Sequence, residues 1–373
     1  GELNWSPPRN VAGSPCAWSL EQIAMLAALL ALMASLVAVA SCGKQSEGLR
    51  AFEGTGRWGG ARQLRLSRPP PRPLWTYWDS AEQPSLVQLC MGTWRQHMGS
   101  GWELHVLSRE SLGRYLESRD LPAAFEQLQP SFKADAVRLA LLRRHGGAWL
   151  DATAIATQNF SDWIDADFAA GQRFVGFYID HYTSQHGPPL IASWAMGVPQ
   201  REETIMVAWH EAYLQLWTNR STADDISEDP FFAEADLSHV DPFMRDYLHV
   251  ELVLLALLQQ DSSLRAELED SSTLLRAEDT AYVLQASLGL TWMANNKCAP
   301  LTTPLASLAS GTRRALEQTP LVKLRHEDRK WLLQMPAAML LCRPDSVLGS
   351  LLSREAPSQP LETECEDSSE DTD

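Results

Sequence analysis

The sequence predicts an α/β domain in which helices flank a mostly parallel sheet, preceded by one transmembrane helix. Short apolar runs with strand character alternate with longer segments of helical spacing, which is typical of chains that form parallel sheets. A helix over residues 131–145 ends at two glycines, and a short apolar strand ending at Asp151 follows at once. Near the beginning of the sequence, residues 23–40 contain no charged side chain.

The composition is that of a globular protein, because 45% of the 373 residues are hydrophobic and 21% are charged. This length is enough for one large domain, or for a large and a small one, with tails. The net charge of −16 argues against a nucleic-acid partner, since phosphate binding needs clustered lysine and arginine. The six cysteines form no CxxC pair and no cluster with zinc spacing.

The uncharged segment is long enough to cross a membrane, since 18 helical residues rise about 27 Å. We interpret residues 23–41 as a transmembrane signal anchor, preceded by an N-terminal flank over residues 1–22. Two alternatives stay open. One is a signal peptide cleaved near residues 38–41, and the other is a lipoprotein signal, because the VASC sequence at 39–42 resembles a bacterial lipobox.

Residues 43–73 contain GTGRWGG and RPPPRP and show little apolar periodicity, so we expect a flexible stem. The signals for membrane orientation disagree. The arginine-rich flank after the helix favours a cytoplasmic domain, whereas sequons at Asn159 and Asn219 favour a luminal glycoprotein. We expect a single-pass protein of the Golgi or another secretory membrane with a luminal domain, and the orientation stays open.

The main domain is predicted over residues 74–345, and an acidic disordered tail over residues 346–373, which end in ETECEDSSEDTD. Alternating or apolar runs predict strands at 74–78, 102–107, 148–150, 174–179 and 190–196. Helical spacing predicts helices at 85–98, 108–116, 131–145, 202–217 and 244–259.

Polar residues converge at the end of the predicted strand 148–150. Asp151 directly follows this strand, and Asp135 and Arg138 share one face of the preceding helix because they are three residues apart. The pair Gly146-Gly147 lets the chain turn sharply and bring the helix against the strand. Ligands of open α/β sheets bind beyond the carboxyl ends of strands, so the spacing predicts a ligand site. Taken singly, each part also has an ordinary structural interpretation as an ion pair, a cap or a helix end.

The segment 134–153, ADAVRLALLRRHGGAWLDAT, resembles the sugar-binding DxD region of glycosyltransferases with a Rossmann-like GT-A fold. It is most similar to the capsular-polysaccharide-synthesis family and its relatives, the initiating mannosyltransferases of yeast and the glucosylating clostridial toxins. Weaker similarities are spread over residues 73–330. Carboxylate and guanidinium groups in fixed geometry suit the recognition of sugar hydroxyls, and a carboxylate-bound metal suits a diphosphate.

The resemblance implies that the site binds a nucleoside diphosphate sugar, either a UDP- or a GDP-sugar. Asp135 and Arg138 would bind the hydroxyls of the donor sugar. Trp75 would stack near the nucleotide base, and Lys323 would contact the leaving phosphate. The resemblance identifies no nucleophile or catalytic base.

The resemblance also implies that Asp151 and Thr153 contact the diphosphate and a divalent metal, Mn²⁺ or Mg²⁺, with Asp151 as the metal ligand. Thr153 replaces the second aspartate of the DxD pattern, although the capsular family commonly reads DAT. A threonine hydroxyl binds a metal less strongly than a carboxylate does, so metal dependence stays open. Asp162, Asp165 and Asp167 are close in sequence, but a solvated acidic loop is their simpler interpretation.

We therefore predict a membrane-bound glycosyltransferase that moves a hexose to a glycan, polysaccharide or other hydroxyl acceptor. The resemblance implies retention of configuration and metal assistance. The alternative is a membrane scaffold that has the same fold and binds a sugar nucleotide or glycan without turnover. The threonine at position 153 motivates this alternative.

Overall fold

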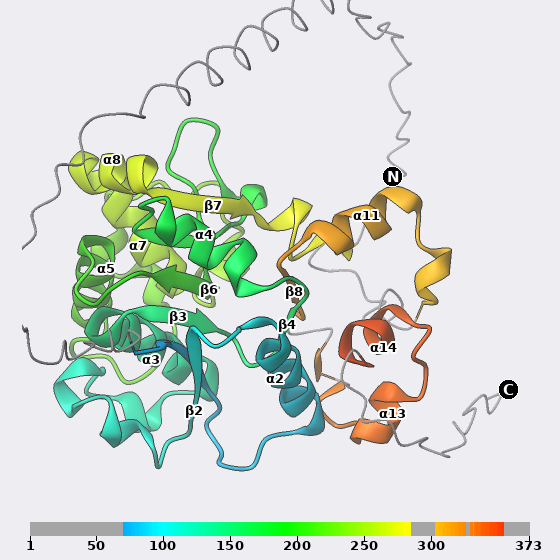
Figure 1. Ribbon diagram of the computed structural model, residues 1–373. Coiled ribbons are helices and arrows are strands. Elements are labelled where there is room, and N and C mark those ends of the chain that lie inside the picture. Colours follow the sequence, from blue (N-terminus) through cyan, green and yellow to red (C-terminus); the bar gives the residue numbers. More distant parts are fainter. Residues whose placement is uncertain (1–69, 285–302, 326–328, 331, 354–373) are drawn as a thin grey trace, which may run out of the picture. The chain divides into compact units, whose positions relative to one another are not determined.

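The computed structural model describes residues 70–284, 303–325, 329–330 and 332–353 (Figure 1). The predicted flank (1–22), the predicted anchor (23–41) and nearly all of the predicted stem lie outside these ranges. Within the described ranges, no helix combines the length and the apolar character that a membrane span requires.

A six-stranded sheet lies at the centre of the domain, with the strand order β2-β1-β3-β6-β5-β7 (Figure 1). β1 pairs in parallel with β2 and β3, and β5 pairs in parallel with β7, whereas β6 runs antiparallel between β3 and β5. The predicted α/β fold with a mostly parallel sheet is therefore confirmed. The strands are β1 (Arg72–Tyr77), β2 (Trp102–Leu107), β3 (Gly147–Leu150), β5 (Phe174–Tyr178), β6 (Ile191–Val198) and β7 (Ser272–Arg276).

Helix α5 packs against both α3 and α7, and α3 and α7 both contact β6. Farther along the chain, α13 and α14 pack against α2. The α-helices of the described residues are α2 (Ser85–His97), α3 (Pro130–His145), α4 (Ile164–Ala169), α5 (Thr204–Leu216), α6 (Pro242–Arg245), α7 (His249–Gln260), α8 (Ser262–Ser271), α11 (Ser310–Gln318), α13 (Ala337–Leu341) and α14 (Val347–Leu352).

A second, two-stranded sheet joins β4 (Ala154–Ala156) to β8 (Leu321–Lys323) in antiparallel register, with Ala154 opposite Lys323. Helix α2 holds β4 in place. The indole nitrogen of Trp94 donates to the Ala154 carbonyl at 2.7 Å, and the Thr93 hydroxyl accepts from the Ala156 amide at 2.9 Å. This sheet therefore brings a C-terminal segment beside the end of β3.

The turn between α3 and β3 requires both of its glycines, as the sequence predicted. Gly146 and Gly147 have φ angles of +68° and +89°, which L side chains rarely adopt. A Cβ atom at Gly147 would lie 2.1 Å from the carbonyl oxygen of Pro73. The close approach of β3 to β1 thus depends on the absence of a side chain at this position.

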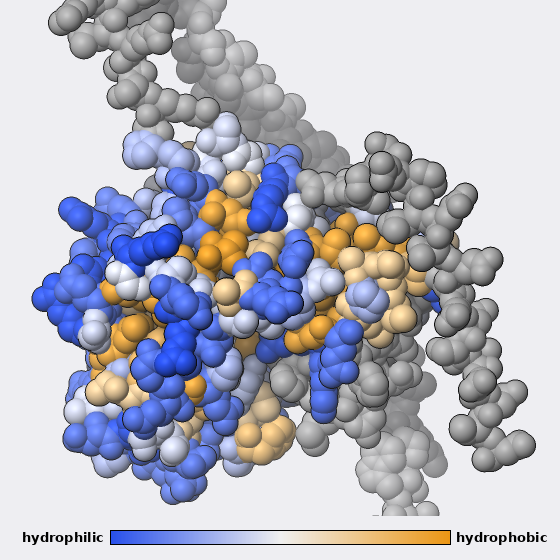
Figure 2. Space-filling model, turned by 90° about the horizontal axis from the view of Figure 1, so that it is seen from below, coloured by the Kyte–Doolittle hydropathy of each residue, from blue (hydrophilic) through white to orange (hydrophobic). Residues whose placement is uncertain are grey.

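Large aromatic side chains fill much of the core. Trp94, Trp149, Trp209 and Trp217 are among the largest fully buried side chains. Figure 2 shows that, on one face of the molecule, apolar residues are exposed in patches between hydrophilic ones. Such exposure is ordinary for a folded protein, and the core supplies the main drive for folding.

Several predicted boundaries are wrong. The predicted helix 244–259 is two helices, α6 and α7, which a turn over residues 246–248 separates. The predicted helix 108–116 contains only a 3₁₀ turn, Leu112–Arg114. The Ser111 hydroxyl accepts from the Ser108 amide at 2.8 Å and donates to the Ser108 carbonyl at 3.1 Å, so it competes with helix formation.

Two predicted domain limits also need correction. β1 begins at Arg72, so the sheet includes the last residues assigned to the stem. The acidic tail cannot begin at residue 346, because Ser346 caps α14 by accepting from the Gly349 amide at 3.0 Å. Most residues of α14 are buried. Residues 354–373 lie outside the described ranges.

Candidate functional site

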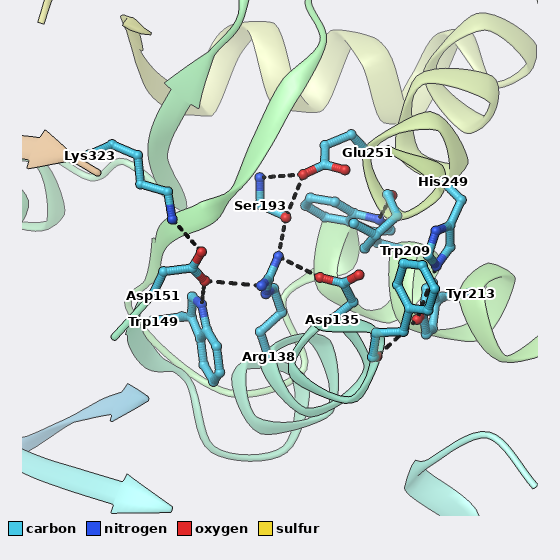
Figure 3. Close-up of polar contacts among 12 residues, drawn as sticks. Asp135, Arg138, Trp149, Asp151, Ser193, Trp209, Tyr213, His249, Glu251 and Lys323 are labelled. Carbon is cyan, nitrogen blue, oxygen red and sulfur yellow. Dashed lines mark hydrogen bonds and ion pairs between the residues drawn. The ribbon is translucent and has the colours of Figure 1, made fainter. Parts of the chain in front are cut away.

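Charged and polar side chains from several elements meet at the carboxyl end of β3 (Figure 3). Asp151 follows the last residue of β3, and its amide donates to the Trp194 carbonyl of β6 at 2.8 Å. The other side chains come from α3, β6, α7 and β8. We call this group the charged cluster, and its members are Asp135, Arg138, Asp151, Ser193, Glu251 and Lys323.

Arg138 lies at the centre of the charged cluster and is only 5% exposed. Its guanidinium contacts Asp135 at 2.9 Å and Asp151 at 3.0 Å, and it also donates to the Ser193 hydroxyl. The same group lies over the Trp149 ring, 5.3 Å from its centroid. The structure therefore brings Asp135, Arg138 and Asp151 together, as their spacing predicted.

Ser193 and Glu251 extend this network and were not predicted from the sequence. The Ser193 hydroxyl donates to the Glu251 carboxylate at 2.6 Å, and the Ser193 amide contacts the same oxygen at 3.3 Å. One signal could have identified Glu251. It is the only acidic residue in the apolar helix α7, and a buried acid normally needs a polar partner.

Both oxygens of the Asp151 carboxylate have hydrogen-bond or ion-pair partners. One oxygen accepts from Arg138 and from the indole nitrogen of Trp149 at 3.1 Å, while the other oxygen pairs with Lys323. Thr153 is 1% exposed, and its hydroxyl accepts from the Arg329 guanidinium at 3.2 Å. Cationic side chains therefore already contact both polar positions of the predicted Asp-Ala-Thr motif.

Burial raises the pKa values of the carboxylates, neighbouring cations lower them, and the net direction differs from one carboxylate to the next. Burial raises the pKa of Asp135 to about 7, even though Arg138 opposes the shift, and burial also raises the pKa of Glu251. Burial alone would raise the pKa of Asp151 as well, but Lys323 and Arg138 hold it well below its usual value. Asp151 is thus the anion to which the cations bind at neutral pH.

The two basic side chains of the charged cluster stay largely protonated at neutral pH. Burial lowers the pKa of Lys323 to about 8, although Asp151 counteracts this shift. For Arg138, burial acts downward, but the neighbouring carboxylates outweigh it and raise the pKa. The site therefore presents cations at a buried position, where their interactions with a ligand are weakly screened.

A wall of aromatic side chains lies beside Asp135 (Figure 3). The rings of Tyr213 and His249 are stacked with centroids 5.7 Å apart, and Nδ1 of His249 is 2.9 Å from the Asp246 carbonyl. Burial lowers the pKa of His249 to about 4, so this imidazole is neutral at physiological pH. This wall explains why water solvates the Asp135 carboxylate so little.

Two buried donors beside the charged cluster have no hydrogen-bond acceptor within the described ranges. They are Nε of Arg138 and Nε1 of Trp194. The Trp194 ring lies next to Lys323, whose ammonium is 5.5 Å from the ring centroid. A buried donor without an acceptor is costly, so these two atoms are suited to oxygen atoms of a bound ligand.

The residues in this arrangement do not fit the predicted divalent metal. Among the described residues there is no group of three or more His, Cys, Asp or Glu side chains that could hold a metal ion. Both oxygens of Asp151 have basic or N–H partners, and Thr153 offers only a neutral hydroxyl that already accepts from Arg329. A divalent cation at a diphosphate takes ligands from phosphate and water, but it still needs one or two protein carboxylates that are free to bind it.

The acidic residues that follow Asp151 closely in the sequence do not complete such a site. Asp165 contacts Arg72 at 2.7 Å and the indole nitrogen of Trp102 at 3.1 Å. Asp167 accepts from the Thr273 hydroxyl at 2.9 Å. These carboxylates stabilise the opposite end of the strands, so they are not simply the solvated acidic loop that we expected.

Trp75, which the resemblance implies as the base-stacking residue, is packed inside the domain. Trp75 is 2% exposed, and its ring is stacked on His105 with centroids 4.5 Å apart. Its indole nitrogen donates to the Gly146 carbonyl at 2.9 Å. Trp75 thus fixes the turn after α3 and offers no face to a base in this structure.

Comparison with known proteins is consistent with the resemblance in the sequence. Residues 63–232 match the family model described as capsular polysaccharide synthesis protein. O-glycosyltransferase PaGT of Phomopsis amygdali is 30% identical over 185 residues, which are 45% of this chain and 43% of that protein. O-glycosyltransferase braB of Annulohypoxylon truncatum is 22% identical over 173 residues, or 42% of this chain and 40% of that protein.

The chain thus spans less than half the length of these curated relatives. A solved structure titled PaToxG Glycosyltransferase is similar to 67% of this chain and 85% of its own, with 14% identity and a TM-score of 0.32.

Proposed function

We propose that this chain is a glycosyltransferase, because residues 63–232 match the family model described as capsular polysaccharide synthesis protein. The single observation that carries the proposal is the buried guanidinium of Arg138, which lies between Asp135 and Asp151 at the carboxyl end of β3. This is the edge at which α/β sheets bind ligands. Both curated relatives are named O-glycosyltransferases, which supports transfer to an acceptor oxygen.

The proposed donor is a UDP- or GDP-linked hexose. Asp135 and Arg138 would bind hydroxyls of the sugar, since a carboxylate and a guanidinium in fixed geometry can accept from and donate to adjacent hydroxyls. The unpartnered Nε atom of Arg138 is a further donor for a sugar oxygen. Asp151 would act by holding Arg138 and Lys323 in position.

In the proposed reaction, an acceptor hydroxyl oxygen forms a bond to the anomeric carbon of the hexose. The bond between that carbon and the diphosphate oxygen breaks, and the electron pair leaves with the diphosphate. The hydroxyl proton passes to solvent or to the phosphate. Transition-state charge develops on the leaving oxygen, so fixed cations beside it lower the barrier. Retention of configuration and a glycan acceptor are parts of this proposal, as are a Golgi or other secretory location and the membrane anchor at 23–41.

The experiment is a donor panel on the full chain. UDP- and GDP-hexoses are incubated with the protein, with and without glycan acceptors, and the released nucleoside diphosphate is measured. We expect release from at least one donor and a faster release with an acceptor. If no donor in the panel is either bound or turned over, the proposal is wrong.

The second candidate is a protein that binds a sugar nucleotide without turning it over. Two observations favour it. Both oxygens of the Asp151 carboxylate already have basic partners, and the second position of the motif is the neutral Thr153. Calorimetry separates the two candidates when it is run beside the donor panel. Saturable binding of an intact sugar nucleotide without release of nucleoside diphosphate would support this candidate.

A further inference from the structure

The charged cluster has the charge balance of an anion site. Its two cations, Arg138 and Lys323, are joined by Arg329, which contacts Thr153. These three cations lie among three carboxylates, Asp135, Asp151 and Glu251. Burial raises the pKa of Asp135 to about 7, so partial protonation of this carboxylate makes the net charge positive near neutral pH, and burial shifts the pKa of Glu251 in the same direction. A divalent metal at a diphosphate site would instead need at least one carboxylate free to bind it, and both oxygens of Asp151 already have partners.

Backbone hydrogen bonds fix Lys323 against the Asp-Ala-Thr motif. Lys323 lies opposite Ala154 in the β4–β8 register, and the Leu324 amide is 3.4 Å from the Thr153 carbonyl. The Lys323 amide also donates to the Ala281 carbonyl at 3.0 Å. The position of Lys323 is therefore set by backbone bonds that do not depend on its ammonium.

The side chains of this segment contact both polar positions of the motif. The Lys323 ammonium pairs with the Asp151 carboxylate, and the Arg329 guanidinium donates to the Thr153 hydroxyl at 3.2 Å. In a DxD site, these two positions would face the metal ion. Here a lysine and an arginine lie there, and Nε1 of Trp194 beside Lys323 is a buried donor without an acceptor within the described ranges.

We propose that Lys323 and Arg329 neutralise the diphosphate of the sugar donor in place of a divalent metal, so that donor binding needs no metal. This inference rests on the proposed glycosyltransferase function. Cationic side chains can supply such stabilisation, because charge-assisted bonds from lysine and arginine to phosphate are strong in a buried site. Under this assignment, the Mn²⁺ or Mg²⁺ that the resemblance implies is not needed for donor binding.

The test is calorimetric titration of the full chain with UDP and with GDP, once in EDTA and once with Mn²⁺. We expect one of the two nucleotides to bind in EDTA with a Kd within about threefold of its value with Mn²⁺. We also expect no saturable binding of Mn²⁺ alone. Binding that appears only with Mn²⁺ overturns the inference but leaves the proposed function standing. If neither nucleotide nor any sugar nucleotide binds in either condition, the proposed function itself fails.

Variants test whether the two cations are responsible. Lys323→Met and Arg329→Met are each expected to weaken nucleotide binding by about tenfold or more, without recovery on addition of Mn²⁺. The control is Arg173→Met, because Arg173 contacts Glu203 and Glu267 at 2.7 Å at the amino end of β5 and should not affect binding. Unchanged binding in Lys323→Met, or its recovery by Mn²⁺, overturns the inference.

Lys323→Met removes one ion-pair partner of the buried Asp151 and can therefore destabilise the fold. A conservative variant separates this effect from the loss of charge. Lys323→Arg keeps the positive charge, and we expect it to retain nucleotide binding in EDTA within about fivefold of the unchanged chain. A tenfold or larger loss in Lys323→Arg, in a protein that melts like the unchanged chain, would contradict charge neutralisation as the role of this residue.

Discussion

The same local arrangement of an arginine, an aspartate and a tryptophan occurs at both ends of the parallel strands β1, β2 and β3, once at the carboxyl end of β3 and once at the amino ends of β1 and β2. At the carboxyl end, Asp151 binds Arg138 at 3.0 Å and the indole nitrogen of Trp149 at 3.1 Å, and the guanidinium lies over that ring. At the amino end, Asp165 binds Arg72 at 2.7 Å and the indole nitrogen of Trp102 at 3.1 Å, again with the guanidinium over the ring.

The two arrangements differ in burial and in their further partners. The Arg72 side chain is 42% exposed, whereas that of Arg138 is 6% exposed. Arg138 also contacts Asp135 and Ser193, and Asp151 also contacts Lys323. The comparison teaches that local pairing does not identify a site. The candidate site differs from an ordinary surface ion pair because several charged side chains meet there and are shielded from water.

The largest expected difference is between the two arginines. Arg138→Met should lower donor turnover by at least about 100-fold, because transition-state contacts to the sugar are lost. It should also lower the free energy of unfolding by about 3–5 kcal/mol, since buried carboxylates lose their partner. Arg72→Met should cost only about 0–1 kcal/mol, because its ion pair is exposed, and it should leave turnover unchanged. Denaturant unfolding and nucleotide release measure both effects, and equal losses in the two variants would contradict the comparison.

The next effect concerns the turn that brings α3 to the end of β3. Gly147→Ala should lower the free energy of unfolding by about 3 kcal/mol or more, because the added Cβ would lie 2.1 Å from the Pro73 carbonyl oxygen. The control is Gly171→Ala, which has a similar φ of +95° but nothing within 4 Å of the added Cβ. Its cost should be about 1–2 kcal/mol, from backbone strain alone. A Gly147→Ala variant as stable as Gly171→Ala would mean that β1 and β3 are not packed this closely.

A smaller effect concerns the pH dependence of stability. The pKa of Asp135 is about 7 in the folded protein, against an ordinary value of 3.8, so the folded state binds this proton more tightly. The protonated Asp135 carboxyl group therefore stabilises the folded state fully below about pH 4, and this stabilisation is lost as the pH rises towards 7. Between pH 5 and pH 7.5 it should fall by about 2 kcal/mol.

Asp135→Asn removes this titration, so its unfolding free energy should decline less over the same interval. Denaturant unfolding of both proteins at pH 5 and pH 7.5 checks this prediction. Identical changes in the two proteins would show that Asp135 is not a buried carboxylate with a raised pKa.

Local sequence signals were enough to predict the parts of the fold that local interactions determine. The predicted helix 131–145 is α3, Pro130–His145, and the predicted strand 102–107 coincides with β2. The turn was predictable because only glycine adopts its backbone angles without strain. Asp135, Arg138 and Asp151 converge as expected, because helix periodicity and this turn determine where they lie.

The remaining parts depend on contacts between distant segments. Strands β4 and β8 have only three residues each, and their register joins Ala156 to Leu321, so neither has a local pattern that predicts a strand. Ser193 and Glu251 enter the site only when β6 and α7 pack beside α3. The resemblance suggested Trp75 as a base-stacking residue, but it could not reveal that His105 covers the ring.

The central claim is that the carboxyl-end arrangement around Asp151 is the donor site and that the similar amino-end arrangement around Asp165 is structural. The most direct test compares nucleotide release from the best UDP- or GDP-hexose by Asp151→Asn and Asp165→Asn, in proteins whose melting curves show that they are folded. We predict a loss of at least about 100-fold for Asp151→Asn and less than about twofold for Asp165→Asn. An Asp151→Asn variant that releases the nucleotide as fast as Asp165→Asn would contradict the claim.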